Sequence, residues 1–220
     1  MTDSRAIGPT GAGKSRRTQA ERTEETRGKI LAAAVQVLSK KGYVGFRTPD
    51  VADAAQVSRG ALTHHFPSKD ELIAATLEYA FGGATQRGAF RAHRPGSVDA
   101  TLAALIKDSQ DFFFSDLFLI GLEFSALSRR DPENGIPIDA ISRSSRLPLE
   151  AAWVEALIAS GVPEAIAEDV LWLTNSIVRR LAVRCLWQDD RPRFNRTLRM
   201  WRSMVKVYIE QGGKLPPERE

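Results

Sequence analysis

The sequence predicts an all-α fold in which a small N-terminal unit of three helices precedes a larger helical unit. Apolar residues recur at the i, i+4, i+7 and i+8 spacing of one helix face, first at Ile30, Ala34, Val37 and Leu38. No segment shows the sustained alternation of apolar and polar residues that is typical of a half-buried strand. Proline and glycine divide the rest of the chain into helix-length segments.

The composition is that of a globular protein with a substantial core. Hydrophobic residues make up 43% and charged residues 26% of the 220 residues. Cys185 is the only cysteine, which excludes an intrachain disulfide and a cysteine-bound metal cluster and favours the reducing cytoplasm. The most apolar stretch, residues 112–127, is shorter than a bilayer span of ~20 residues, and the first residues lack the apolar core of a signal peptide. We therefore expect no membrane partner.

Positive charge is concentrated in the N-terminal part of the chain. Residues 1–70 contain 12 Lys and Arg against 7 Asp and Glu, whereas residues 71–220 contain 19 against 20. Because phosphate neutralisation depends on where the cations sit, this asymmetry favours a polyanion-binding head on a neutral body.

The N-terminal unit is expected to consist of an arm and three helices. Residues 1–20 are polar and rich in Gly, Ser, Thr and Arg, so they predict a disordered basic arm. A first helix begins near residue 21 and ends at Gly42, where glycine relieves a left-handed C-cap. Two short helices, over about 48–55 and 58–65, complete a unit that spans residues 21–67.

A connecting helix and hinge, residues 68–95, lead to the larger unit, residues 96–215. The connecting helix runs from Ser68 to about Arg91 and is weakened near Gly82 and Gly83. Proline, glycine and apolar periodicity predict five body helices, over roughly 97–108, 110–130, 134–160, 163–188 and 191–211. Pro148 is expected to kink or break the third of these.

Residues 48–66 have the layout of a helix-turn-helix. Thr48 is a suitable N-cap with Pro49 at the first helical position, and Ser58 can cap the second helix. The apolar residues of this segment can pack on the first helix as a three-helix core, through Val51, Ala55, Val57, Leu62 and Phe66.

The outer face of the second short helix carries Arg59, Gly60, Ala61, Thr63 and His64. Arginine can bind guanine O6 and N7 with two hydrogen bonds, and the methyl groups of alanine and threonine can contact the thymine methyl. Small residues also let the helix backbone approach the groove closely. This face predicts sequence-specific binding of double-stranded DNA.

The same segment resembles the DNA-binding head of the TetR family of regulators. The resemblance covers about residues 21–80 and is most specific over residues 57–72. It implies a helix-turn-helix DNA-binding domain followed by a helical effector-binding and dimerisation domain. It also implies base reading by the arginine and its two small neighbours, and contacts to phosphates or flanking bases from Thr48, Ser58, Thr63, His64, His65 and Lys69.

Two residues depart from the family pattern. Gln56 stands where the family usually has the turn glycine, and Thr63 stands where it usually has a phosphate-binding tyrosine. The first departure concerns the geometry of the turn, and the second removes one large phosphate contact.

For the body, the resemblance implies a pocket for a small-molecule effector of unknown identity. Aromatic side chains and one amide that could line an apolar pocket are Phe113, Phe118, Phe124, Trp153, Trp172 and Asn175. Aromatic residues at these positions are more often plain core, so the pocket is a hypothesis about their use.

Residues 170–187 spread apolar side chains around most of one helix, which is more than a single core face requires. With the last helix they predict a two-fold, four-helix homodimer interface made by Leu171, Val178, Ala182, Leu198, Trp201 and Val205. Two-fold symmetry would place two reading helices ~34 Å apart on a palindromic operator.

These observations predict a regulator of transcription rather than an enzyme. Ligand binding in the body would shift the heads away from operator spacing, so that the operator is released. We expect no cofactor and no metal: His64 and His65 are adjacent on a helix, point about 100° apart and have no third ligand nearby in the sequence.

Three other classes of protein remain open. Residues 8–15 satisfy the P-loop pattern of nucleotide-binding enzymes, although no apolar strand precedes them and the stretch that follows is polar. A helical carrier of small molecules would not bind duplex DNA in a salt-dependent way. A DNA-binding activator of the same fold, or a constitutive architectural protein, would differ only in where its operator lies relative to a promoter.

Overall fold

The computed structural model describes residues 18–94, 96–130 and 136–213, and within these ranges it contains nine helices and no strand. The predicted all-α fold is confirmed. In chain order the helices are α1 (Gln19–Gly45), α2 (Thr48–Ala55), α3 (Arg59–His65), α4 (Lys69–Ala92), α5 (Val98–Phe113), α6 (Asp116–Arg130), α7 (Ile138–Ser160), α8 (Glu164–Cys185) and α9 (Arg191–Glu210).

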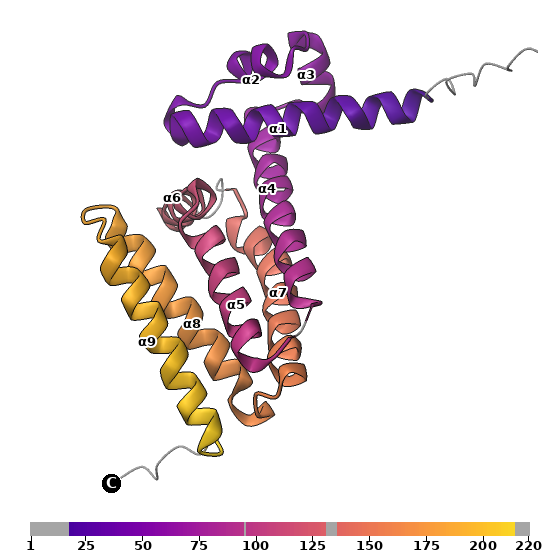
Figure 1. The fold of residues 1–220 in the computed structure, drawn as a ribbon. Helices are drawn as coiled ribbons and strands as arrows, with labels where there is room; N and C mark the ends of the chain where they lie inside the picture. The colour runs from indigo at the N-terminus through magenta and orange to yellow at the C-terminus, as the bar shows by residue number, and fades with distance from the viewer. Residues whose placement is uncertain (1–17, 95, 131–135, 214–220) are drawn as a thin grey trace, which may run out of the picture.

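The helices form a head and a body that α4 connects. Figure 1 shows α2 and α3 lying along α1, and α4 running from this head into the body beside α5 and α7. Helices α8 and α9 lie next to each other on the outer side of the body, and α6 lies between α1 and the body helices. This arrangement places α3 at one end of the molecule and the α8–α9 pair along its flank.

The first helix begins at Gln19, two residues before the start expected at residue 21. Thr18 is the N-cap of α1: its hydroxyl accepts a hydrogen bond from the Glu21 N–H at 3.2 Å, and the Glu21 carboxylate accepts one from the Thr18 N–H at 2.7 Å. This capping box satisfies two N–H groups that the helix leaves free. The rest of the predicted arm and the P-loop-like residues 8–15 lie outside the described residues.

The three-helix core of the head is confirmed. Ile30 and Leu38 of α1 are buried against Val51 of α2 and Leu62 of α3, and Phe66 closes the same cluster. Each large side chain removed from water in this way contributes about 1.5–3 kcal/mol. Buried residues of α4 extend the cluster, namely Leu72, Ile73, Leu77 and Phe81.

The core of the head continues into the body. Tyr43 at the end of α1 meets Phe124 of α6 edge to face, with ring centroids 5.2 Å apart. Phe124 and Ile138, from α6 and α7, are buried in the same cluster as the head residues. The boundary at residue 67 stays a prediction, and this shared core gives the body a direct packing contact with the helix that supports α2 and α3.

Polar side chains buried in the body tie three helices together. Asp108 of α5 is 5% exposed, and its carboxylate accepts hydrogen bonds from Arg91 of α4 at 2.9 Å and from the Trp153 indole of α7 at 3.1 Å. The neighbouring Ser109 donates a hydrogen bond to Asn175 of α8 at 2.8 Å. Both polar groups are therefore satisfied inside the helix packing.

These partners explain the main error in the predicted helix boundaries. The break expected at residue 109 lies instead at Phe114 and Ser115, because Asp108 and Ser109 are interior residues of one continuous helix. The third body helix begins at Ile138 rather than at 134. Pro148 does not break that helix. Close to it, the Ser145 carbonyl accepts a hydrogen bond from the Thr85 hydroxyl of α4 at 3.0 Å.

No helix in the part of the chain that the structure describes combines the length and the hydropathy needed to cross a bilayer.

Candidate nucleic-acid interface and ligand pocket

Helix α3 is held in place from its N-terminus and from its inner face. The Ser58 hydroxyl accepts a hydrogen bond from the Ala61 N–H at 3.1 Å, which confirms the predicted cap. Leu62 and Phe66 are buried beneath the helix, and the Arg27 guanidinium of α1 lies 5.7 Å from the centre of the Phe66 ring. These contacts fix which face of α3 points outward.

The turn before α3 has the left-handed conformation that glycine usually adopts, although the residue there is Gln56. Gln56 has φ 56° and ψ 43°, and it is the only non-glycine residue of the described chain with a positive φ. Its N–H bonds to the Asp53 carbonyl at 3.2 Å, and the next N–H, that of Val57, bonds to Ala52 at 3.0 Å. A side chain in this left-handed conformation costs about 1–2 kcal/mol, which the packing of α2 and α3 offsets.

The start of α2 differs from the prediction by one residue. The predicted N-cap is Thr48, but the carbonyl of Arg47 already accepts the first N–H groups, from Asp50 at 3.1 Å and Val51 at 3.4 Å. Arg47 is therefore the N-cap, and it makes no side-chain capping bond. Asp50 instead places a carboxylate in the first turn, where it binds Lys41 of α1 at 2.8 Å.

The outward face of α3 presents a free cation beside an open backbone. Arg59, Gly60, Thr63 and His64 are exposed, and no described residue pairs with the Arg59 guanidinium. A Cβ placed on Gly60 would meet only the Ser58 hydroxyl, at 4.0 Å. Internal packing therefore does not require a glycine here, and the space it leaves faces solvent.

The other predicted contact residues lie around this face and differ in exposure and in the contacts that their side chains make. Ala61, His65 and Thr48 are half-buried, and Thr63 donates its hydroxyl to the Arg59 carbonyl at 3.0 Å. The Lys69 ammonium lies 4.7 Å from the centre of the Tyr43 ring and 3.5 Å from the Tyr43 carbonyl oxygen.

The ammonium of Lys69 must therefore turn away from Tyr43 to bind a phosphate, and its DNA contact stays a prediction. Arg47, which is not among the predicted contact residues, is also exposed, at the N-terminus of α2. The signal was present in the sequence, because a cation immediately before a helix start lies beside a natural anion site.

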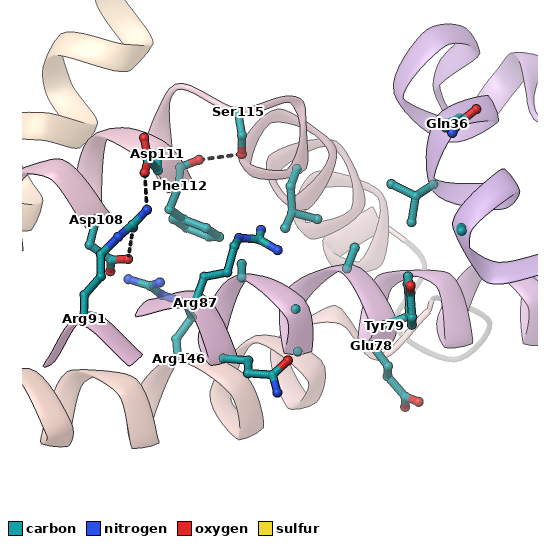
Figure 2. Close-up of a pocket in the computed structure, with 18 residues that line it drawn as sticks. Gln36, Glu78, Tyr79, Arg87, Arg91, Asp108, Asp111, Phe112, Ser115 and Arg146 are labelled. Atoms are coloured by element: carbon teal, nitrogen blue, oxygen red, sulfur yellow. Dashed lines mark hydrogen bonds and ion pairs between the residues drawn. The ribbon is translucent and has the colours of Figure 1, made fainter. Parts of the chain in front are cut away.

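A pocket of about 840 Å³ lies where head and body meet. Small side chains of α1 and α4 form one part of its wall, and charged groups of α4, α5 and α7 form another, including Arg87, Arg91 and Arg146. Figure 2 shows Arg91 directed at Asp108 and Asp111, while Arg87 and Arg146 extend toward Phe112. The pocket thus combines an apolar wall with a group of cations.

The residues expected to line a ligand pocket are not brought together. Phe113 and Phe118 pack on each other with ring centroids 5.1 Å apart, Phe124 lies at the junction of head and body, and Trp153 binds Asp108. Asn175 binds Ser109, and Trp172 is 61% exposed on α8.

None of these six residues lines the 840 Å³ pocket, whereas Phe112 does. Phe112 and Phe113 are successive residues of α5, and successive residues of a helix point in different directions.

The residues expected at a dimer interface are mostly interior. Five of them are at most 5% exposed in the single chain, so a second chain cannot reach them: Leu171, Val178, Ala182, Leu198 and Val205. Trp201 is half-buried and donates its indole N–H to Thr174 at 2.9 Å. The assignment of faces was therefore wrong, because both faces of α8 are apolar and periodicity does not tell which of them packs on α5.

The opposite faces of α8 and α9 carry the exposed apolar residues. The α8–α9 patch consists of five side chains that are 50–61% exposed and line a shared groove of about 980 Å³: Trp172, Leu173, Met200, Met204 and Val207. Isolated apolar residues are common on protein surfaces, whereas apolar residues that share one groove are typical of interaction sites.

No three His, Cys, Asp or Glu side chains within residues 18–94, 96–130 and 136–213 are grouped so that they could hold a metal ion.

Comparison with known sequences gives matches over most of the chain and matches over about 65 residues. A sequence profile of bacterial regulatory proteins of the tetR family matches residues 30–76. The HTH-type transcriptional regulator CymR of Pseudomonas putida is 44% identical over 181 residues, which is 82% of this chain and 89% of that protein. The HTH-type transcriptional regulator TtgR of Pseudomonas putida is 41% identical over 63 residues, 29% of this chain and 30% of that protein.

Solved structures share the fold at low sequence identity. A TetR-family transcriptional regulator from Streptomyces coelicolor superposes with a TM-score of 0.61 at 22% identity, covering 83% of this chain and 94% of that one. A protein from Saccharomonospora viridis, solved in complex with choline, superposes with a TM-score of 0.62 at 18% identity, covering 85% and 96% of the two chains.

Proposed function

This chain belongs to the TetR family of bacterial regulatory proteins, and we propose that it is a cytoplasmic repressor that binds a palindromic operator as a homodimer and releases it when a small molecule binds. It is a DNA-binding regulator of transcription, like the proteins it matches. The direction of regulation, the symmetry of the operator and the response to a ligand are the parts that we propose.

The outward face of α3 is the observation that carries the proposal. Arg59 is exposed and free of a described partner, and Gly60 leaves open space beside it. A helix with this composition can place a guanidinium against the edge of a guanine while its backbone approaches the groove. The Ser58 cap and the buried Leu62 hold the helix in one orientation, so little order has to be gained on binding.

A second copy of the chain is the occupant we propose for the α8–α9 patch. Burying Trp172, Met204 and their neighbours against the same residues of a two-fold-related chain would form a four-helix interface and remove apolar surface from water. Two heads related in this way would read the two halves of an inverted repeat about one helical turn, ~34 Å, apart.

The pocket at the junction of head and body supports release by a ligand. Val35 and Gln36 of α1 line it together with Gly83 of α4 and Leu117 of α6. A ligand there touches the helix that supports α2 and α3, so it can favour one head position over another. The choline complex of the Saccharomonospora viridis protein supports small-molecule binding by this fold.

Selection of bound duplexes from a random DNA pool tests the proposal. We expect the full-length protein to enrich an inverted repeat whose half-sites are about one helical turn apart, with an affinity that falls as salt rises. The absence of an enriched motif, or a direct repeat, would contradict it. Mapping the enriched sequence relative to promoters then separates a repressor, whose site overlaps the promoter, from an activator, whose site lies upstream.

A further inference from the structure

Building on the proposed release by a ligand, we infer that the effector is an organic monocarboxylate with an apolar body, bound in the junction pocket with its carboxylate on Arg146 and Arg87.

The acidic groups at the charged end of the pocket are already engaged. Arg91 binds Asp108 at 2.9 Å and Asp111 at 2.6 Å, and Lys107 also pairs with Asp111. The second oxygen of Asp108 accepts the Trp153 indole N–H. These carboxylates are therefore satisfied without Arg87 or Arg146.

Arg87 and Arg146 are the cations of the pocket that have no ion pair with a described residue. Burial lowers the pKa of Arg146, and the charges of Asp108 and Glu150, which lie beyond ion-pair distance, oppose that effect. A guanidinium that has lost water without gaining a carboxylate is in an unfavourable position, and an anionic ligand would relieve it.

The geometry of Arg146 suits a carboxylate. Its guanidinium lies 4.2 Å from the centre of the Phe112 ring, which holds it by a cation–π contact. Stacking occupies a face of the guanidinium and leaves N–H donors at its edge, the edge that pairs with a carboxylate through two hydrogen bonds. Figure 2 shows Arg87 reaching into the same region from α4.

The rest of the pocket selects an apolar body and a single negative charge. Small or apolar side chains of α1, α4 and α6 line it, among them Ala32, Val35, Ala80 and Leu117. Figure 2 shows Glu78 on the side away from the arginines. The ionised lining residues balance to zero net charge, which favours one carboxylate over a multiply charged phosphate: Arg87, Arg91, Arg146, Glu78, Asp108 and Asp111.

Titration calorimetry on the full-length protein tests the inference with matched pairs of probes. The acids are naphthalene-2-carboxylate, 4-phenylbutyrate and octanoate, each compared with its carboxamide, and inorganic phosphate is the control anion. We expect at least one acid to bind about tenfold or more tightly than its amide, a difference of about 1.4 kcal/mol, and we expect no binding of phosphate.

Three variants locate the carboxylate. Arg146→Gln and Arg87→Gln should each weaken binding of the acid about tenfold or more and leave the weaker binding of the amide unchanged. Arg143→Gln is the matched control, because Arg143 lies on the same helix with its side chain 69% exposed, and it should bind the acid like the wild type. Arg146→Lys keeps the charge and loses the paired N–H donors of the guanidinium, so its affinity for the acid should be intermediate. Thermal melting curves serve to check that each variant is folded.

Equal binding of acids and amides, unchanged binding by the Arg146 and Arg87 variants, or binding of none of the acids by a protein that still selects DNA would overturn the inference. Failure of the proposed function looks different: either no DNA is selected, or an acid binds as expected without weakening DNA binding. In the second case the carboxylate site stands and its regulatory role does not.

Discussion

At the residue scale, the proposed DNA contact rests on the exposed charge of Arg59 and on the open space beside Gly60. Both positions were predictable from the sequence, because the cap at Ser58 and the buried Leu62 fix the orientation of so short a helix. The N-cap of α2 was not predictable from the sequence. Its position depends on which backbone carbonyl accepts the first helical hydrogen bond, and the type of residue does not determine that. The contact between Lys69 and Tyr43 joins residues far apart in the chain and has no local signal.

Gly60→Leu should separate folding from DNA binding. The new side chain meets open space, and leucine favours a helix over glycine by up to about 1 kcal/mol, so the melting temperature should not fall. The same side chain blocks the approach of the backbone to the groove, so affinity for the selected operator should fall about tenfold or more. Thermal denaturation and fluorescence anisotropy measure the two effects. Unchanged affinity would mean that this face of α3 does not enter the groove.

Gln56→Gly should stabilise the protein by about 0.5–1 kcal/mol. Glycine adopts the left-handed conformation of this turn without the strain that a side chain adds, although it gains more freedom in the unfolded chain. Gln56→Ala keeps the Cβ and is the control, for which no gain is expected. Chemical denaturation compares the three proteins, and a glycine variant no more stable than the alanine variant would show that the turn is unstrained.

At the scale of elements, the sequence predicted those helices whose ends carry local signals. Ser58 and Ser68 are the observed N-caps of α3 and α4. The signals failed where long-range partners decide the outcome. Asp108 lies within a helix because Arg91 and Trp153 satisfy it, and neither partner is near it in sequence.

Gly88→Ala tests how closely α4 packs on its neighbours. A Cβ at Gly88 would lie 2.8 Å from a Leu149 methyl group and 2.9 Å from an Asp108 oxygen, and both of those side chains are buried and held. Overpacking of this kind costs about 1–3 kcal/mol.

Gly82→Ala is the matched control for this prediction. Gly82 lies on the same helix, a Cβ added there would have nothing within 4 Å, and the change should stabilise the protein by up to about 1 kcal/mol. Denaturant melts of the two variants should shift in opposite directions. A shift in the same direction would contradict the close approach of α4 to α5 and α7.

At the scale of the whole molecule, an inner core and an outer apolar patch lie on opposite faces of the α8–α9 pair. The sequence predicted a second apolar face on α8 but assigned the inner residues, such as Val178, to it. Only the tertiary packing on α5 shows that Trp172 and Met204 are the outward residues. The junction pocket likewise draws its lining from five helices, so no segment of sequence could have indicated it.

Replacing Trp172 and Met204 together by glutamate should produce a folded monomer. Both side chains are exposed in the single chain, so the core is untouched, while two charges per chain would be buried in the proposed interface. Loss of the second head should weaken binding to the inverted repeat about a hundredfold or more. Leu147→Glu, at another exposed apolar position, is the control. Sedimentation measures the mass, and a variant that stays dimeric would place the interface elsewhere.

The most direct test of base reading by α3 is the affinity of Arg59→Ala for every single-base variant of the selected operator. Loss of the guanidinium should relax the preference at one position in each half-site by about 1–3 kcal/mol and leave the other positions as selective as in the wild type. Lys69→Ala should instead weaken binding to all variants alike. A uniform loss for Arg59→Ala, with every base preference retained, would contradict the account.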